Sequence, residues 1–196
     1  MTINTEDILQ SIMESLSRID YIKPDDIPNI DLYMDQVTTF MDSQLKSSKR
    51  YPEDKILTKT MINNYAKNHL LPTPDKKKYS KEHVLLLIFI YYFKGFLSIG
   101  DIQSLLEPLT KKYFKNTDGI CIESIYREVF SMEKSQIESM QADLAAKYAA
   151  AQETFKDVPD EDALFLRLFS FISLLSFDVY VKKQIIEKII DSFQDG

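Results

Sequence analysis

Apolar residues recur three to four positions apart along almost the whole chain, which is the spacing of one face of an α-helix. The first segment shows this spacing between residues 8 and 19 and predicts a helix over 7–18, capped by Thr5. Later segments repeat it between short polar or proline-containing stretches. The sequence therefore predicts an all-α protein.

The composition argues against several classes of protein. The 196 residues include only four glycines and contain no GxGxxG or GxxxxGK[ST] string, which argues against a nucleotide-dependent enzyme. A single cysteine, Cys121, cannot form an internal disulfide, and with two histidines there is no cluster for structural zinc. We expect neither a metal nor a cofactor. The acidic N-terminus lacks the features of a signal peptide, so we expect a cytoplasmic protein.

The middle of the chain contains the clearest signals for where helices begin and end. Thr58, Ser80 and Ser98 each stand where the N-cap of a helix is expected. Pro72 stops the first of the three helices that these caps begin. Three short helices with tight joins are predicted, preceded by an amphipathic helix over 32–45.

The chain beyond Cys121 predicts longer helices. One covers 133–155, and its alanines permit close approach of a neighbour, so it could form a dimer interface or pack inside the monomer against the last segment, 164–190. In that last segment Arg167 and Asp178 leave only ten uncharged residues between them. We expect this stretch to be too short to span a bilayer and to form a buried helix of an all-α core.

Four motifs follow one another in register between residues 57 and 106. They are a Leu-Leu-Pro turn (70–72), a lysine run closed by Tyr-Ser (76–80), a Gly-Phe pair (95–96) and a Ser-capped helix ending in Leu-Leu (98–106). In this order they resemble the MerR-type winged helix-turn-helix of bacterial transcription regulators. The chain as a whole is also similar to an uncharacterised bacterial family with a domain of unknown function.

The resemblance to MerR-type regulators implies three parts of the chain. An N-terminal helix and linker over 1–29 precede a DNA-binding module over 30–116, in which a tiny β wing follows the recognition helix. A helical C-terminal domain over 117–196 would serve dimerisation or effector binding. The implied function is that of a sequence-specific transcriptional regulator that binds double-stranded DNA and catalyses nothing.

The predicted recognition helix presents a polar face suited to the major groove. Thr60, Asn63, Asn64 and Lys67 share the face opposite Ile62, where asparagine can pair with adenine and lysine with guanine or phosphate. The lysines of the wing would reach phosphates or the minor groove. The predicted DNA-binding residues are Thr60, Asn63, Asn64, Tyr65, Lys67, Lys76, Lys77, Lys78 and Tyr79.

The distribution of charge gives an independent argument for DNA. The net charge is −6, but residues 46–115 hold 14 Lys+Arg against 6 Asp+Glu, a net of +8, and the remainder therefore carries −14. A basic segment that coincides with the motifs is the electrostatic footprint of a DNA reader. The other interpretation is that these lysines lie in solvated loops.

Departures from the MerR pattern keep a second hypothesis open. Arginine is common in that family at the positions of Thr60 and Asn63, and Asn64 replaces the first of two tyrosines. The chain could therefore be a helical protein-protein adaptor that has lost DNA binding. An enzyme is the third hypothesis, but no acid, base or nucleophile supports it: His69 and His83 have no partner at ligand spacing, and we expect His83 to be exposed.

Two further partners follow from the same arguments. We expect a homodimer, because paired recognition helices reading symmetric half-sites multiply affinity. The aromatic residues within 89–96 and 165–177 could line a pocket for a small apolar effector, or could simply form core. No membrane partner is expected.

Overall fold

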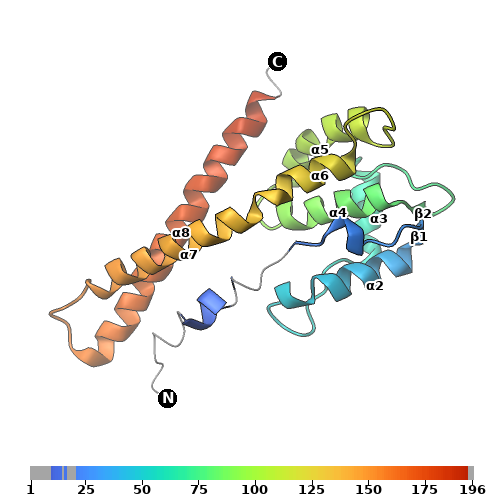
Figure 1. Ribbon diagram of the computed structural model, residues 1–196. Helices are drawn as coiled ribbons and strands as arrows, with labels where there is room; N and C mark the ends of the chain where they lie inside the picture. Colours follow the sequence, from blue (N-terminus) through green and yellow to red (C-terminus); the bar gives the residue numbers. More distant parts are fainter. Residues whose placement is uncertain (1–9, 15, 17–20, 194–196) are drawn as a thin grey trace. The chain divides into compact units, whose positions relative to one another are not determined.

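A computed structural model describes residues 10–14, 16 and 21–193, and the side chains of all of these except 133–135 and 160–161 (Figure 1). The structure is 68% helical and has a small two-stranded antiparallel sheet, so the expected all-α fold class is confirmed. Of the helix predicted over 7–18, residues 10–14 and 16 are helical. The rest of that prediction, with its cap Thr5, lies outside the described residues.

The chain divides into two compact units. Unit 1 comprises Met1–Tyr21 and Phe130–Ile185, and unit 2 comprises Ile22–Val129 and Ile186–Gly196. Unit 2 thus continues past residue 116, because the helix that follows still contributes buried side chains to it, including Tyr126.

Unit 2 contains the basic segment and all the predicted DNA-binding residues. Its helices are α2 (Met34–Gln44), α3 (Lys59–Lys67), α4 (Lys81–Phe93), α5 (Ile99–Tyr113) and α6 (Ile122–Ser131), the last of which ends in unit 1. Short 3-10 helices cover Pro24–Asp26 and Lys46–Ser48. Strands β1 (Leu32–Tyr33) and β2 (Lys78–Tyr79) pair antiparallel, with Leu32 opposite Tyr79 and Tyr33 opposite Lys78. The second predicted helix therefore starts at Met34, because the two residues before it join the sheet.

The core of unit 2 centres on α4, which is apolar around its whole circumference. Such a helix is stable only when it is covered on all sides. All residues from 83 to 90 are buried. Fully buried side chains also come from the other helices, namely Met41, Ile62, Ile102, Leu106, Ile122 and Tyr126. The apolar face of α3 is thereby held in the core.

The three N-caps predicted in this region are confirmed. The Thr58 hydroxyl accepts a hydrogen bond from the Met61 N–H at 3.2 Å, and the Ser98 hydroxyl accepts one from the Asp101 N–H at 3.1 Å. Ser80 caps α4 in a capping box whose other member is His83. Each bond satisfies an N–H that the first turn of a helix leaves without a partner.

The two ends of the long segment of unit 2 are fastened to each other. The buried Tyr126 hydroxyl donates a hydrogen bond to the Ile22 carbonyl at 2.8 Å. Beside it the Arg127 guanidinium donates to both carboxylate oxygens of Asp25, at 2.5 and 3.2 Å, and this hydrogen bonding lowers the pKa of the Asp25 carboxyl. We call these four residues the clasp.

Unit 1 contains a helical hairpin of α7 (Glu133–Gln152) and α8 (Asp160–Ser192), whose last residues belong to unit 2 (Figure 1). Leu144 and Ala151 of α7 pack with Phe171 of α8 in a small core. Lys147 of α7 also pairs with Asp178 of α8 at 2.7 Å. The apolar face of α7 is thus used inside the monomer, which is one of the two alternatives that the sequence left open.

Two expectations for the last helix are wrong. Among the described residues of α8 only Ala163, Phe171 and Ile190 are buried, because α7 covers one face of a helix that is apolar on several. By length and composition alone, Asp162–Ser192 would also suffice to cross a membrane. Its most apolar stretch of 18 residues contains no more than two charged side chains, which are too few to make the stretch polar on average.

Candidate nucleic-acid interface

Helix α3 presents the predicted polar face to solvent. Thr60, Asn63, Asn64 and Lys67 are all exposed, whereas Ile62 on the opposite side is completely buried. The helix ends at Lys67, short of the predicted Leu-Leu-Pro turn, because Asn68 caps it and His69 adopts a positive φ of 57°. A solvent-facing row of amide, hydroxyl and ammonium groups is therefore fixed by burial of the other face.

Two of the residues predicted to contact DNA are not on this surface. Tyr65 and Tyr79 are only 5% and 3% exposed, and burial raises the pKa of both phenols. Their periodic positions match the apolar face of α3 and the inward side of β2, so neither ring can reach a duplex as the structure stands. Both rings belong to the core of unit 2, and Tyr79 also lines the groove that α3 shares with the wing.

The wing is a tight hairpin turn with lysines at its tip. The Lys78 N–H donates to the Asp75 carbonyl at 2.7 Å, and the two residues between them, Lys76 and Lys77, have φ of 47° and 65°. A two-residue hairpin turn with positive φ at both central positions normally holds Asn-Gly or a similar pair, because residues with a Cβ pay for that conformation. Each lysine costs about 1 to 2 kcal/mol there by the usual left-handed penalty.

Lys78 differs from the two lysines before it. It lies in β2, is half-buried, and its ammonium stands over the Tyr33 ring, 5.3 Å from the centroid. Sequence reasoning missed Tyr33, which it placed inside a helix. No local signal in the sequence shows that residues 32–33 pair with 78–79, so only the fold could reveal this contact.

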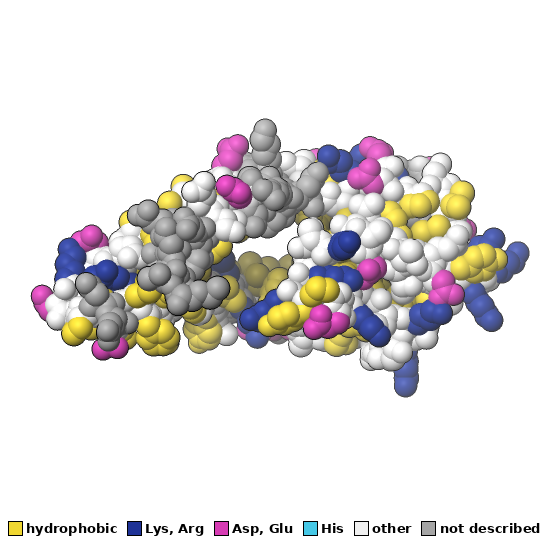
Figure 2. Space-filling view, turned by 90° about the horizontal axis from the view of Figure 1, so that it is seen from below, with side chains coloured by type: hydrophobic (Ala, Val, Ile, Leu, Met, Phe, Trp, Pro, Cys, Tyr) yellow, Lys and Arg dark blue, Asp and Glu magenta, His cyan; other side chains and the backbone are white. Residues whose placement is uncertain are grey.

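The wing and α3 share one surface. Asn63 of α3 and Lys77 of the wing line the same groove of about 460 Å³, together with Tyr33 and Lys59. Lys59 is ion-paired with Asp35 across this groove. On unit 2, Figure 2 shows Lys and Arg side chains gathered over the end that carries β1 and β2 in Figure 1. The fold therefore brings together two of the predicted elements that are separated in the sequence.

Several basic residues of the segment 46–115 are engaged elsewhere. Carboxylates pair with Lys49, Lys81 and Lys111 at 2.6, 2.9 and 2.6 Å, respectively. By contrast, Lys67, Lys76 and Lys77 form no ion pair with any residue that the structure describes. The α3 and wing surface thus carries three cationic groups that are available to a polyanion.

His83 was expected to be exposed, and this expectation is wrong. The side chain is 1% exposed, and the Ser80 N–H donates to its Nδ1 at 3.0 Å. The ring contacts Tyr79 and Phe114 edge to face, with centroids 5.7 and 4.8 Å away. Burial lowers the pKa of His83 to about 4, so the imidazole is neutral near pH 7 and acts as a packing and capping group.

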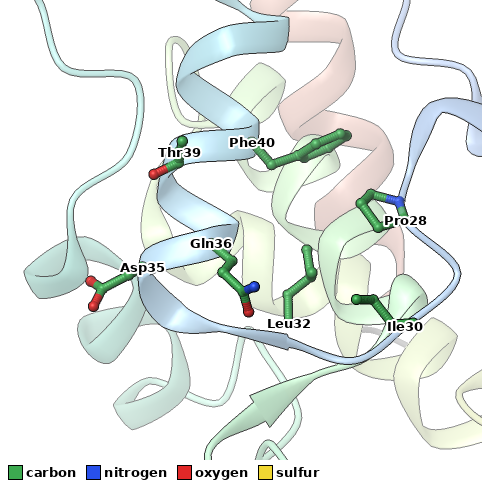
Figure 3. Close-up of a pocket in the computed structure, with 7 residues that line it drawn as sticks. All are labelled: Pro28, Ile30, Leu32, Asp35, Gln36, Thr39 and Phe40. Atoms are coloured by element: carbon green, nitrogen blue, oxygen red, sulfur yellow. The ribbon is translucent and has the colours of Figure 1, made fainter.

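The aromatic residues considered for an effector pocket differ in exposure. Phe89 and Phe171 are buried, while Phe165, Phe169 and Phe177 are more than half exposed. A different groove, of about 450 Å³, lies beside α2 (Figure 3). Figure 3 shows its apolar side chains converging while Asp35 points away from them. The lining residues are Pro28, Ile30, Leu32, Asp35, Gln36, Thr39 and Phe40.

Among the residues that the structure describes, no group of three or more His, Cys, Asp and Glu could hold a metal ion. Cys121 is free and half-buried at the start of α6. Neither a metal site nor Cys121 therefore adds to the chemistry of the α3 and wing surface, which rests on its own polar and cationic groups.

Comparison of the chain with curated proteins and with solved structures finds no match. The resemblance to MerR-type regulators therefore stays a prediction. One family model, described as a domain of unknown function (DUF1836), matches residues 22–129. The match coincides with the Ile22–Val129 segment of unit 2 and covers more than half of the chain. The protein thus belongs to the DUF1836 family.

Proposed function

We propose that unit 2 binds double-stranded DNA, with α3 in the major groove and the wing tip against backbone phosphates. The observation that carries the proposal is the pair of left-handed lysines, Lys76 and Lys77. Glycine would remove the backbone cost at both positions, so a folding requirement alone does not account for lysine there. Backbone strain of this kind concentrates at functional sites, and two exposed ammonium groups at a hairpin tip suit phosphate oxygens.

The α3 surface supplies groups of the right chemistry for the duplex. Asn63 and Asn64 can each donate and accept toward an adenine edge, and Lys67 can donate to guanine or to phosphate. A nine-residue helix with one buried face presents these groups as a single convex row. The major groove is about 12 Å wide and admits such a helix.

The order of the elements supports a regulator rather than a nonspecific DNA-binding protein. Strand β1 and helix α2 precede α3, the wing follows it, and α4 and α5 come next. This is the order that the resemblance to MerR-type transcription regulators implies. We therefore extend the proposal to sequence-specific transcriptional regulation in the cytoplasm, without catalysis.

The test of DNA binding is the salt dependence of affinity. Fluorescence anisotropy with a labelled duplex, over 50 to 300 mM salt, should show affinity falling steeply with ionic strength. In Lys76→Ala/Lys77→Ala the slope of log K against log salt should shrink by about 1.8, since each lost phosphate contact removes about 0.9. The matched control is Lys111→Ala/Lys112→Ala, which removes the same charge from exposed lysines of α5.

The two double variants separate a specific surface from general charge. Equal losses in both would show that the wing has no special role. No salt-dependent binding by the wild-type chain would refute the proposal. Selection from a randomised duplex library tests the sequence-specific part: Asn63→Ala and Asn64→Ala should each relax the preference at particular base pairs, whereas Lys77→Ala should weaken all sequences alike.

A further inference from the structure

The face of α8 that points away from α7 carries an apolar stripe. Phe165, Phe169, Ile172 and Val179 are 57% to 67% exposed, although all are large and apolar. With Ser176, which is also exposed, they follow one another at intervals of four, three, four and three residues. We call these five residues the α8 stripe.

The spacing of the stripe is that of a helix-helix seam. Intervals that alternate between three and four residues keep successive side chains along one line of a helix. A second helix packs against such a line in a coiled coil. The buried Phe171 lies on the other side of α8, where it packs with Leu144 and Ala151 of α7. Helix α8 thus has two packing faces, and α7 occupies only one of them.

The stripe and the apolar residues beside it are together too large for an ordinary solvent-facing surface. With the flanking Phe177 and Tyr180, which are 65% and 60% exposed, it leaves apolar side chains bare over several turns. From the usual size of these side chains, the exposed area is roughly 700 Å². The largest apolar patch of a typical monomer is about 300–600 Å². A specific protein interface buries about 800 Å² on each partner.

The neighbouring charges of unit 1 argue against a membrane as the covering partner. Asp178 of α8 is ion-paired with Lys147 of α7, and Lys147 also contacts Asp143. Arg167 donates from Nε to the Thr154 carbonyl at 3.3 Å. Because α7 packs along α8, a bilayer that enclosed the stripe would also have to enclose these charges, which is expensive.

We propose that the α8 stripe is the contact surface between two copies of this chain. Such a contact is isologous, because the same patch from each copy faces the other across a two-fold axis. It replaces the α7 interface that the sequence left open, since the apolar face of α7 is used within the monomer. The proposal does not rest on DNA binding, because it concerns unit 1 alone.

Multi-angle light scattering on the full chain tests the proposal directly. The wild type at micromolar concentration should have twice the chain mass of 22.8 kDa. Ile172→Glu should give the monomer mass with unchanged helicity by circular dichroism, because the residue is exposed in the monomer. The matched control is Ile120→Glu in unit 2, since Ile120 and Ile172 are both 58% exposed. A monomeric wild type, or equal dissociation by both variants, would overturn the proposal.

A second readout avoids disruptive substitutions. The chain has no tryptophan, so Phe169→Trp introduces a single indole into the stripe. Its emission should shift to the blue as protein concentration rises in plain buffer, whereas Tyr51→Trp, at an exposed site of unit 2, should not respond. A shift of the Phe169→Trp emission that appears only with phosphatidylglycerol vesicles would show a lipid surface instead and refute the dimer. Either result is independent of whether the protein binds DNA.

Discussion

Lowering the pH from 7 to 5 should destabilise the folded protein through His83. In the folded chain burial holds the pKa of this imidazole at about 4, against an ordinary value of 6.5. The unfolded chain therefore takes up a proton over this interval while the folded chain stays largely neutral. The stabilising contribution is complete above the unfolded pKa and is lost as the pH falls toward the folded pKa.

The size of the effect follows from the two pKa values. A shift of one pKa unit corresponds to about 1.4 kcal/mol, so the full difference is about 3 kcal/mol. At pH 5 most of this difference has developed, and the loss between pH 7 and pH 5 is about 2 kcal/mol. For a small domain this is a sizeable fraction of a total free energy of unfolding of about 5 to 15 kcal/mol.

Urea unfolding followed by circular dichroism, at pH 7 and at pH 5, measures the loss. The reference variant is His83→Gln, because glutamine cannot titrate in this range and can still accept the hydrogen bond from Ser80. Wild type should lose about 2 kcal/mol more than this variant. The control is His69→Gln, which changes the exposed second histidine and should keep the wild-type pH dependence. Equal losses in wild type and His83→Gln would show that burial of His83 does not govern the pH response.

Three other predictions concern single positions. Thr58→Ala should lower the free energy of unfolding by about 1 kcal/mol in urea unfolding, because the α3 cap is lost, and no change would mean that this bond is not formed. Lys77→Gly should raise thermal stability by about 1 kcal/mol while weakening DNA binding, and lower stability would show that the wing turn is unstrained. Tyr126→Phe should cost about 1 to 3 kcal/mol by leaving the buried Ile22 carbonyl without its donor, and a neutral result in urea unfolding would contradict the clasp.

Local signals explain which parts of the fold could be predicted. Thr58, Ser80 and Ser98 begin helices because their hydroxyls satisfy backbone groups within three residues, and such a bond depends on nothing distant. The polar face of α3 was predictable for the same reason, since burial of Ile62 fixes the direction of Asn63 and Asn64. Periodicity and capping together determine which way each short helix faces.

The features that escaped prediction depend on contacts distant in sequence. A first-turn residue such as His83 normally faces solvent, but here Tyr79 and Phe114 close over its ring. Similarly, Tyr65 and Tyr79 are aromatic residues near a basic segment, and only the packed structure shows that they belong to the core. A tyrosine side chain has the same chemistry in the core as on a DNA-binding surface, so residue type alone does not distinguish the two locations.

The wing and α8 show two further limits of the sequence. The segment from Asp75 to Lys78 has no glycine or asparagine at its centre. No residue type in it therefore predicts the left-handed backbone of Lys76 and Lys77. Periodicity also shows that α8 is apolar but not what covers each of its faces. Exposure of the α8 stripe therefore depends on the folded structure, in which α7 covers only one face of α8.

The clasp has a consequence for how this domain can be combined with others. Because Tyr126 and Arg127 hold the segment around Ile22 and Asp25, the chain enters and leaves the family domain at a single place. A domain with adjoining ends can be grafted into another polypeptide, or receive new segments at either end, without stretching its core. In evolutionary terms, the clasp allows residues 22–129 to be joined to different partner domains while the α3 and wing surface is kept.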